Sequence, residues 1–229
     1  MPQLTVEQFA KLFDHTLLKA DARRAGFEQL CAEAREHGFA MVAINPGPVA
    51  LCRELLAGSD VRVGAAIAFP LGQNTVAQKV AETAASIDDG AQEIDYVVNQ
   101  TALKDGDLAL VEREMREIVE LCRARGVLSK VIFENCYLTD DEKRSLAGIA
   151  KDVEPDFIKT STGFGTGGAT FADVELMRSA VGDKVQIKAA GGLRTLDDVL
   201  RYLDLGVTRV GSSASIAILS EYRTMVGAR

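Results

Sequence analysis

Two lysines lie inside apolar segments that have the pattern of β-strands. Lys159 occurs in FIKTS and Lys188 in VQIKAA. Burying an ammonium group is costly unless its charge is paired or neutralised, although a single lysine can extend its charged end to solvent. Two lysines near the ends of neighbouring strands indicate instead that both face one cavity, where their repulsion lowers the pKa of one of them. The pair therefore predicts a free amine that attacks a carbonyl group and forms a Schiff base.

A carboxylate occupies a similar position in another strand-like segment. Asp95 lies in the middle of EIDYVV, with apolar residues on both sides. One interpretation is a structural carboxylate that is paired with a lysine or an arginine. The other is a general acid or base close to the two lysines, kept ionised by their charge and able to exchange protons through a water molecule. The two interpretations are compatible.

Three glycine-rich segments follow the last strand-like segments of the chain. The first begins at Gly163, the second is the pair Gly191 and Gly192, and the third runs from Gly211 to Ser213. One glycine pair is weak support for a binding site, because turns alone require glycine. Three such segments together predict a phosphate site, in which backbone N–H groups and serine hydroxyls donate to the anion.

The sequence predicts no metal site and no nucleotide-binding loop. The two histidines are not accompanied by acidic residues at ligand spacing: His15 is expected to be a structural hydrogen-bonding residue, and His37 precedes a glycine at the end of a helix. No G-x-G-x-x-G follows the first strand, and there is no P-loop lysine. The four cysteines form no C-x-x-C pair, which is typical of free thiols in a reducing compartment: Cys31, Cys52, Cys122 and Cys136.

The composition excludes several classes of protein. The chain has 229 residues, with 26 basic and 33 acidic side chains and a net charge of −7, which disfavours binding to nucleic acid or to an anionic membrane. Its 47% hydrophobic and 26% charged residues exclude a mainly disordered chain. The N-terminal residues have no basic region followed by an apolar one, and no apolar run has the roughly 18 residues that span a bilayer. We therefore expect a soluble cytoplasmic protein.

The candidate residues must be positioned by one repeating unit: a short strand, a loop, and an amphipathic helix that ends near a glycine. Helices are predicted over residues 74–89 and 108–124, and further helices begin after Thr139, Thr170 and Thr195. Thr139 and Glu142 have the spacing of a capping box. The predicted strands cover residues 13–18, 39–44, 61–69, 93–98, 129–134, 156–161, 185–190 and 208–210.

Eight strand–helix units fit a (β/α)8 TIM barrel, which needs about 250 residues. A doubly wound sheet would need fewer strands and a phosphate loop after the first one. No linker or low-complexity segment divides the chain. We therefore predict a single-domain TIM barrel over residues 1–229, with a short extra helix at residues 6–12. Its active site is expected at the carboxyl ends of the strands. The polar residues in or just after the strands are the candidates for this site: Asp14, His15, Asn45, Asp95, Glu134, Lys159 and Lys188.

Five segments of the chain resemble the deoxyribose-phosphate aldolase family. They are DHTLLK from residue 14, FPLG from residue 69, EID from residue 93, FIKTSTG from residue 157 and KAAGGLRT from residue 188. The match runs in order to the GSS segment at residues 211–213 and thus covers nearly the whole chain. KTSTG and KAAGG are the specific motifs, and the others are supportive.

The resemblance implies an enzyme that cleaves 2-deoxy-D-ribose 5-phosphate reversibly to acetaldehyde and D-glyceraldehyde 3-phosphate, without a metal or an organic cofactor. By motif position, Lys159 is the Schiff-base lysine. Lys188 is the second lysine, which lowers the pKa of the first and exchanges protons, and Asp95 is a proton donor and acceptor. The partner is a small phosphorylated sugar, whose phosphate is expected near Gly163, Gly191, Gly192, Gly211 and Ser213.

Two departures from the family pattern and two alternative classes of protein remain at this point. Many relatives have a cysteine where this chain has Ala43, and some end in a tyrosine tail where this chain ends in Gly-Ala-Arg. The route by which the enamine is protonated is therefore open. The alternatives are another phosphosugar barrel, either an isomerase or a transaldolase-type aldolase, and a catalytically silent phosphate-binding barrel. The burial cost of two strand lysines argues against the silent barrel. A homodimer is considered only because barrels often dimerise.

Overall fold

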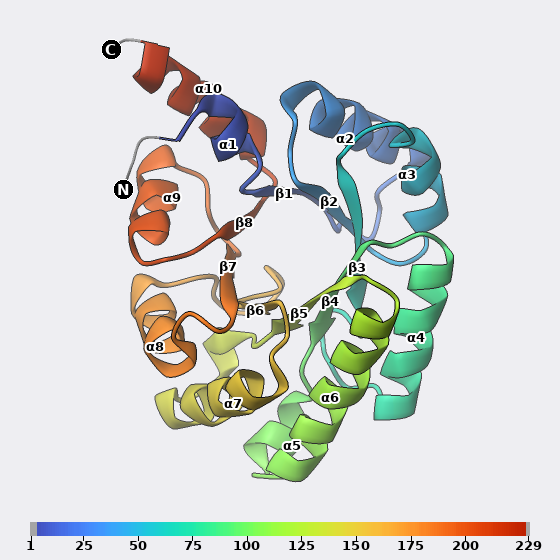
Figure 1. Cartoon of the computed structure of the whole chain (residues 1–229), viewed down its shortest axis with the longest axis vertical. Coiled ribbons are helices and arrows are strands. Elements are labelled where there is room, and N and C mark those ends of the chain that lie inside the picture. Colours follow the sequence, from blue (N-terminus) through green and yellow to red (C-terminus); the bar gives the residue numbers. More distant parts are fainter. Residues whose placement is uncertain (1–3, 228–229) are drawn as a thin grey trace.

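Eight parallel strands close into a barrel, as the sequence predicts (Figure 1). The computed structural model describes residues 4–227. Each strand pairs with the next one along the chain, and β8 returns to pair with β1. The strands are β1 (Phe13–Leu17), β2 (Met41–Ile44), β3 (Arg62–Ile67), β4 (Glu93–Val97), β5 (Leu128–Ile132), β6 (Phe157–Lys159), β7 (Gln186–Ala190) and β8 (Arg209–Ser212).

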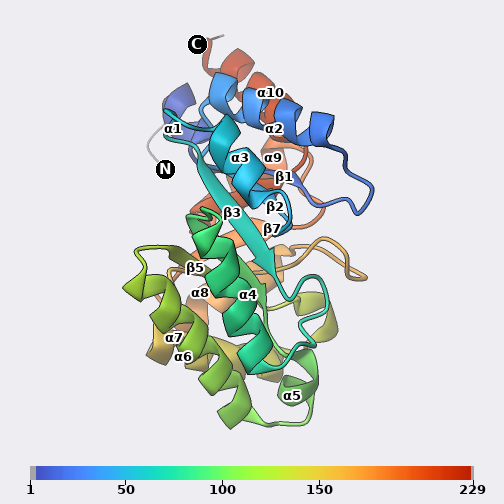
Figure 2. The same cartoon turned by 90° about the vertical axis from the view of Figure 1, so that its right-hand side faces the viewer.

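A ring of helices surrounds the strands, and Figure 2 shows α3 and α4 beside β3. Three of these helices begin after the threonines that the sequence indicates. Thr139 and Glu142 form the predicted capping box, and Thr170 and Thr195 each accept a backbone N–H three residues further on. The helices are α2 (Arg24–His37), α3 (Val49–Leu55), α4 (Val76–Asp88), α6 (Leu108–Ala124), α7 (Asp140–Val153), α8 (Phe171–Val181), α9 (Leu196–Asp204) and α10 (Ser215–Gly227).

The extra N-terminal helix is present and packs against the last helix. It is α1 (Val6–Ala10), shorter than the predicted residues 6–12, and it lies beside α10 (Figure 1). The ring of Phe9 stacks on that of Tyr222 with a centroid distance of 3.9 Å. Two short elements that the sequence did not indicate are α5 (Gln100–Lys104) and the 3-10 turn η1 (Asn135–Tyr137).

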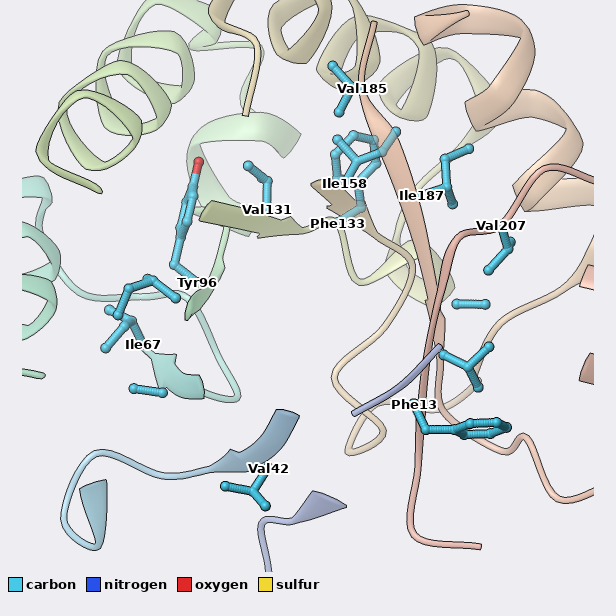
Figure 3. Packing of buried hydrophobic residues seen from close by; sticks show 14 of the residues in the cluster. Phe13, Val42, Ile67, Tyr96, Val131, Phe133, Ile158, Val185, Ile187 and Val207 are labelled. Atoms are coloured by element: carbon cyan, nitrogen blue, oxygen red, sulfur yellow. The ribbon is translucent and has the colours of Figure 1, made fainter. Parts of the chain in front are cut away.

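Alternation along each strand separates an apolar outer face from a charged interior. Val131, Ile158 and Ile187 belong to the apolar cluster between strands and helices (Figure 3). Their neighbours Lys159 and Lys188 point the other way, into the barrel, because successive side chains of a strand lie on opposite faces. The predicted core of small aliphatic residues thus lies mainly outside the strands, and the interior holds ion pairs.

Two strand ends differ from the prediction in ways that affect the site. The strand predicted over residues 61–69 ends at Ile67, because Ala68 takes a positive φ of 50° and donates its N–H to the Glu82 carboxylate at 2.9 Å. The strand predicted over residues 208–210 extends to Ser212. Gly211 therefore lies inside β8, paired with both neighbouring strands, and not in the loop that follows.

Candidate active site

The three residues that the sequence singled out for chemistry meet inside the barrel. Lys159 and Lys188 are direct partners in the register of β6 and β7. Both Nζ atoms contact the same carboxylate oxygen, Oδ2 of Asp95, at 2.9 and 2.6 Å. All three side chains are at most 4% exposed. A buried carboxylate is thus shared by two ammonium groups.

A third lysine, which the sequence analysis passed over, binds the other oxygen of this carboxylate. Lys130 on β5 contacts Asp95 Oδ1 at 2.7 Å and Glu93 Oε2 at 2.5 Å, and its side chain is fully buried. The signal was present in the sequence, because Lys130 also lies within a strand-like apolar segment. In the strand predicted over residues 129–134 it lies near the start, away from the edge at which catalytic residues are expected, whereas in the structure it is the central residue of β5.

The network continues toward the opposite end of the barrel through Asp14 and Arg209. Lys188 Nζ contacts Asp14 Oδ2 at 2.5 Å, and Arg209 Nη1 contacts Asp14 Oδ1 at 2.7 Å. Arg209 also reaches Glu93 at 3.2 Å. Asp14 was a candidate from the sequence, whereas Arg209 and Glu93 were not.

The charges in this network do not balance if every group is ionised. Besides the half-exposed Arg62, which reaches Glu93 at 3.4 Å, four cationic side chains share three carboxylates. Three of these four each contact two carboxylates: Lys130, Lys188 and Arg209. Within the described part of the chain, Lys159 contacts only one, Asp95. Lys159 is therefore the cation whose neutralisation costs least.

The electrostatic environment shifts the pKa values in the same sense. The pKa of Lys159 is lowered to about 8, and burial is the largest cause. The charge of Asp95 opposes this shift, and the charge of Lys188 adds to it. Burial alone would raise the pKa of Asp95, but the three lysines outweigh it and hold that pKa well below its usual range. Repulsion by Lys188, which the sequence suggested as the cause, is thus secondary to burial at Lys159.

Lys159 and Lys188 line a cavity of about 660 Å³ at the carboxyl ends of the strands. Ala43 lies in its wall. Gly211 leaves room for Lys188, because a Cβ at this position would lie 3.1 Å from Lys188 Cε. The residues predicted to surround a phosphate all line this cavity: Gly163, Gly191, Gly192, Gly211 and Ser213.

The family model for DeoC/LacD family aldolases matches residues 9–216 of this sequence. The chain belongs to the DeoC/LacD aldolase family. It is 54% identical to a deoxyribose-phosphate aldolase of Lactobacillus acidophilus over 93% of this chain and 90% of the relative. It is 52% identical to one of Bacteroides thetaiotaomicron over 97% of this chain and 93% of the relative.

A solved structure agrees with the fold of this aldolase. The deoxyribose phosphate aldolase of Aeropyrum pernix, described as a unique tetramer, superposes with a TM-score of 0.87 at 28% identity, covering 97% of this chain and 94% of that one. Membership of an aldolase family sets aside the isomerase and the catalytically silent barrel that the sequence alone left open.

The remaining polar candidates of this aldolase have structural contacts. His15 Nε2 lies 2.8 Å from a Glu33 oxygen and its Nδ1 lies 3.3 Å from Ser215 Oγ, as expected for a structural histidine. Asn45 donates to the Leu18 carbonyl at 3.3 Å. Residues 4–227 contain no group of three histidine, cysteine or acidic side chains placed to hold a metal ion. Cys31 and the other three cysteines are free thiols.

Two observations concern the membrane and the chain end. Among the described helices, none has the length and apolar character needed to cross a bilayer. The C-terminal residues on which the comparison with a tyrosine tail depends, Ala228 and Arg229, lie outside the described residues.

Proposed function

We propose that this aldolase cleaves 2-deoxy-D-ribose 5-phosphate reversibly to D-glyceraldehyde 3-phosphate and acetaldehyde, through a Schiff base on Lys159. The names of the relatives support the substrate. The observation that carries the assignment is the state of Lys159. It lines the cavity, contacts one carboxylate where Lys130, Lys188 and Arg209 each contact two, and has a pKa of about 8. An appreciable fraction of its amine is therefore neutral and nucleophilic near neutral pH.

The first half of the reaction forms the imine. The neutral Nζ of Lys159 attacks C1 of the open-chain aldehyde, and the resulting carbinolamine loses water to give a protonated imine. Lys188 and Asp95 lie within hydrogen-bond distance of each other, and Asp95 also contacts the attacking amine. We assign to this pair the transfer of protons to and from the carbinolamine oxygen.

The second half breaks the bond between C2 and C3, since acetaldehyde retains two carbons. The iminium ion withdraws electrons, the C3 hydroxyl loses its proton, and the C2–C3 electron pair forms the enamine while D-glyceraldehyde 3-phosphate leaves. The enamine gains a proton at C2, and water then hydrolyses the imine to release acetaldehyde and regenerate the amine. Asp95 is the acceptor assigned to the C3 hydroxyl proton, directly or through water, because its carboxyl group is ionised.

The phosphate end of the substrate is assigned to the glycine-rich loops. Gly163, Gly191, Gly192 and Ser213 follow the strand ends, and Gly211 lies in the last strand beside Lys188. Binding energy gained there, away from the bond that breaks, orients C1 toward the amine.

The direct test is to incubate the purified protein with 2-deoxy-D-ribose 5-phosphate and to detect both aldehydes with coupled dehydrogenases. Release of acetaldehyde and D-glyceraldehyde 3-phosphate in equal amounts is the expected result. Formation of an isomeric sugar phosphate without acetaldehyde would contradict the proposal. A second assay with a ketose phosphate donor and an aldose phosphate acceptor tests the transaldolase-type reaction. Transfer of a three-carbon dihydroxyacetone unit there, with no acetaldehyde released from 2-deoxy-D-ribose 5-phosphate, would contradict the proposal.

We further propose that residues 1–229 act as one cytoplasmic domain that assembles as a homodimer. Free cysteines are typical of a reducing compartment, and closed symmetric dimers are the commonest assembly of soluble proteins. Light scattering after size-exclusion chromatography tests the assembly: a mass of two chains is expected, and a mass of one or four chains would contradict it.

A further inference from the structure

A buried carboxylate outside the lysine network follows the end of β5. Glu134 is 2% exposed, and no ion pair within residues 4–227 neutralises it. Instead it accepts hydrogen bonds. The backbone N–H of Thr162 donates to Oε1 at 3.1 Å, the hydroxyl of Thr162 donates to Oε2, and the thiol of Cys136 approaches Oε1 at 3.8 Å. Three donors around one side chain fit an ionised carboxylate, which only accepts.

The two hydrogen bonds that Thr162 donates require the carboxylate of Glu134 as their acceptor. The Thr162 hydroxyl oxygen accepts the N–H of Phe164 at 3.0 Å and passes its own hydrogen to Glu134. A glutamine at position 134 has one oxygen and one NH₂ group. Whichever way that amide is turned, one of the two Thr162 donors meets an N–H. A buried donor without a partner is costly, so the loop would have to move.

Glu134 also forms the surface on which the glycine-rich loop packs. A Cβ at Gly165 would lie 2.6 Å from the Cys136 sulfur and 3.1 Å from Glu134 Cδ. At the other end of the loop, a Cβ at Gly168 would lie 2.0 Å from the carbonyl oxygen of Gly191. The loop over residues 162–168 is therefore held between Glu134 and the loop that follows β7.

The backbone at Glu134 is unusual as well. Its φ is +54°, in the left-handed region that costs energy for any residue with a side chain. The next N–H, that of Asn135, donates to the carbonyl of Thr160 at 2.9 Å, directly after the strand that carries Lys159. This conformation aims the carboxylate at Thr162.

We propose that Glu134 is a positioning residue that fixes the loop over residues 162–168 in the form that receives the phosphate of the substrate. This role of Glu134 rests on the proposed function, because it requires a substrate that is a sugar phosphate. Gly163 lies between Thr162, which donates to Glu134, and Gly165, which packs on Glu134. Together with Thr162 and Phe164 it lines the cavity. Glu134 thus acts on affinity for the phosphate end through Thr162, without touching the reacting carbons.

The test compares Glu134→Gln and Thr162→Val with the conservative variant Thr162→Ser. A fourth variant, Glu142→Gln, alters a carboxylate that accepts the backbone N–H of Thr139 at the start of α7, outside the cavity. For each protein we would measure KM and kcat for 2-deoxy-D-ribose 5-phosphate and for unphosphorylated deoxyribose. Borohydride trapping with acetaldehyde reports on the amine of Lys159, and amide hydrogen exchange reports on residues 162–168.

Glu134→Gln and Thr162→Val should each raise KM for the phosphorylated substrate by about tenfold or more, the equivalent of one charge-assisted hydrogen bond. KM for deoxyribose and the rate of trapping should change by less than about twofold, the scatter expected for distant sites. Hydrogen exchange of the loop should accelerate in both variants but not in Thr162→Ser or Glu142→Gln. The double variant should be no worse than either single one, because both remove the same contact.

Equal losses for both substrates, or loop exchange that is unchanged in Glu134→Gln, would overturn the proposal. These results are separable from failure of the proposed function. If the proposed function is wrong, the wild-type protein will not cleave 2-deoxy-D-ribose 5-phosphate. Hydrogen exchange of residues 162–168 in Glu134→Gln still decides whether Glu134 holds that loop.

Discussion

Replacing Lys188 with methionine should raise the pKa of Lys159. The substitution removes an ammonium group that lies 2.6 Å from Oδ2 of Asp95, the same oxygen that Lys159 contacts at 2.9 Å. Asp95 would then share its charge between two lysines and no longer among three. The ammonium form of Lys159 gains stabilisation and loses a repulsive neighbour, so both changes favour its protonation.

The size of the effect follows from the pKa of about 8. In the wild-type protein about a tenth of the Lys159 side chains are then neutral at neutral pH. Burial, the largest cause of the lowered pKa, remains in the variant, so the pKa returns only part of the way to 10.5. A rise of roughly one to two units would reduce the neutral fraction, and with it the rate of imine formation, by about tenfold to a hundredfold.

The assay is the initial rate of borohydride-trapped imine formation with acetaldehyde, measured at pH values on both sides of 8. The wild-type rate should rise with pH to a plateau above an inflection near 8. In Lys188→Met that inflection should move to higher pH, and the plateau should also be lower because Lys188 no longer transfers protons at the carbinolamine. Lys79→Met is the matched control, because Lys79 is a fully buried lysine paired with Glu114 at 2.6 Å and outside the cavity. An inflection that stays near 8 in Lys188→Met, or that moves to lower pH, would refute the reasoning.

Three further outcomes are expected. Asp95→Asn should lower turnover at least about tenfold, or 1.4 kcal/mol of barrier, at every pH because the amide cannot exchange protons. Imine trapping should persist with its inflection at lower pH, since Asp95 raises the pKa of Lys159, and recovery of turnover in alkali would contradict this assignment. Ser213→Asp should raise KM for 2-deoxy-D-ribose 5-phosphate much more than KM for deoxyribose, since a carboxylate repels the phosphate; equal effects would mean that this loop does not hold it. EDTA should leave turnover unchanged, and a loss that zinc restores would indicate a metal-dependent aldolase.

The barrel and the meeting of the two lysines were predictable because both follow from local patterns. Period-two alternation places a polar residue such as Lys159 on the face opposite Ile158, and eight repeats of strand and helix leave few other topologies. The carboxyl ends of all strands lie at one end of the barrel, so polar residues near those ends converge.

The deeper charge network was not predictable in the same way. Asp95 accepts from three lysines, and Lys188 also contacts Asp14. Both arrangements depend on the register of strands far apart in the sequence. Alternation gives the face on which a side chain lies but not its depth in the barrel. Lys130 was passed over for that reason.

Strand ends were the least predictable feature. The strand predicted over residues 156–161 ends at Lys159, because the next residues form hydrogen bonds of their own: Thr160 Oγ1 donates to the Ala190 carbonyl at 3.2 Å, and Thr162 donates to Glu134. Such contacts join segments that apolar periodicity cannot relate. Glu134 was a polar candidate near a predicted strand end, but its contact with Thr162 was not predicted.

The claim on which the whole account depends is that Lys159 forms the covalent intermediate. The most direct measurement is reduction with borohydride in the presence of 2-deoxy-D-ribose 5-phosphate or acetaldehyde, followed by proteolysis and mass spectrometry of the peptides. The account predicts added mass on Lys159, and none in Lys159→Met. An adduct on Lys188 with Lys159 unmodified, or no adduct in a protein that turns over substrate, would contradict it.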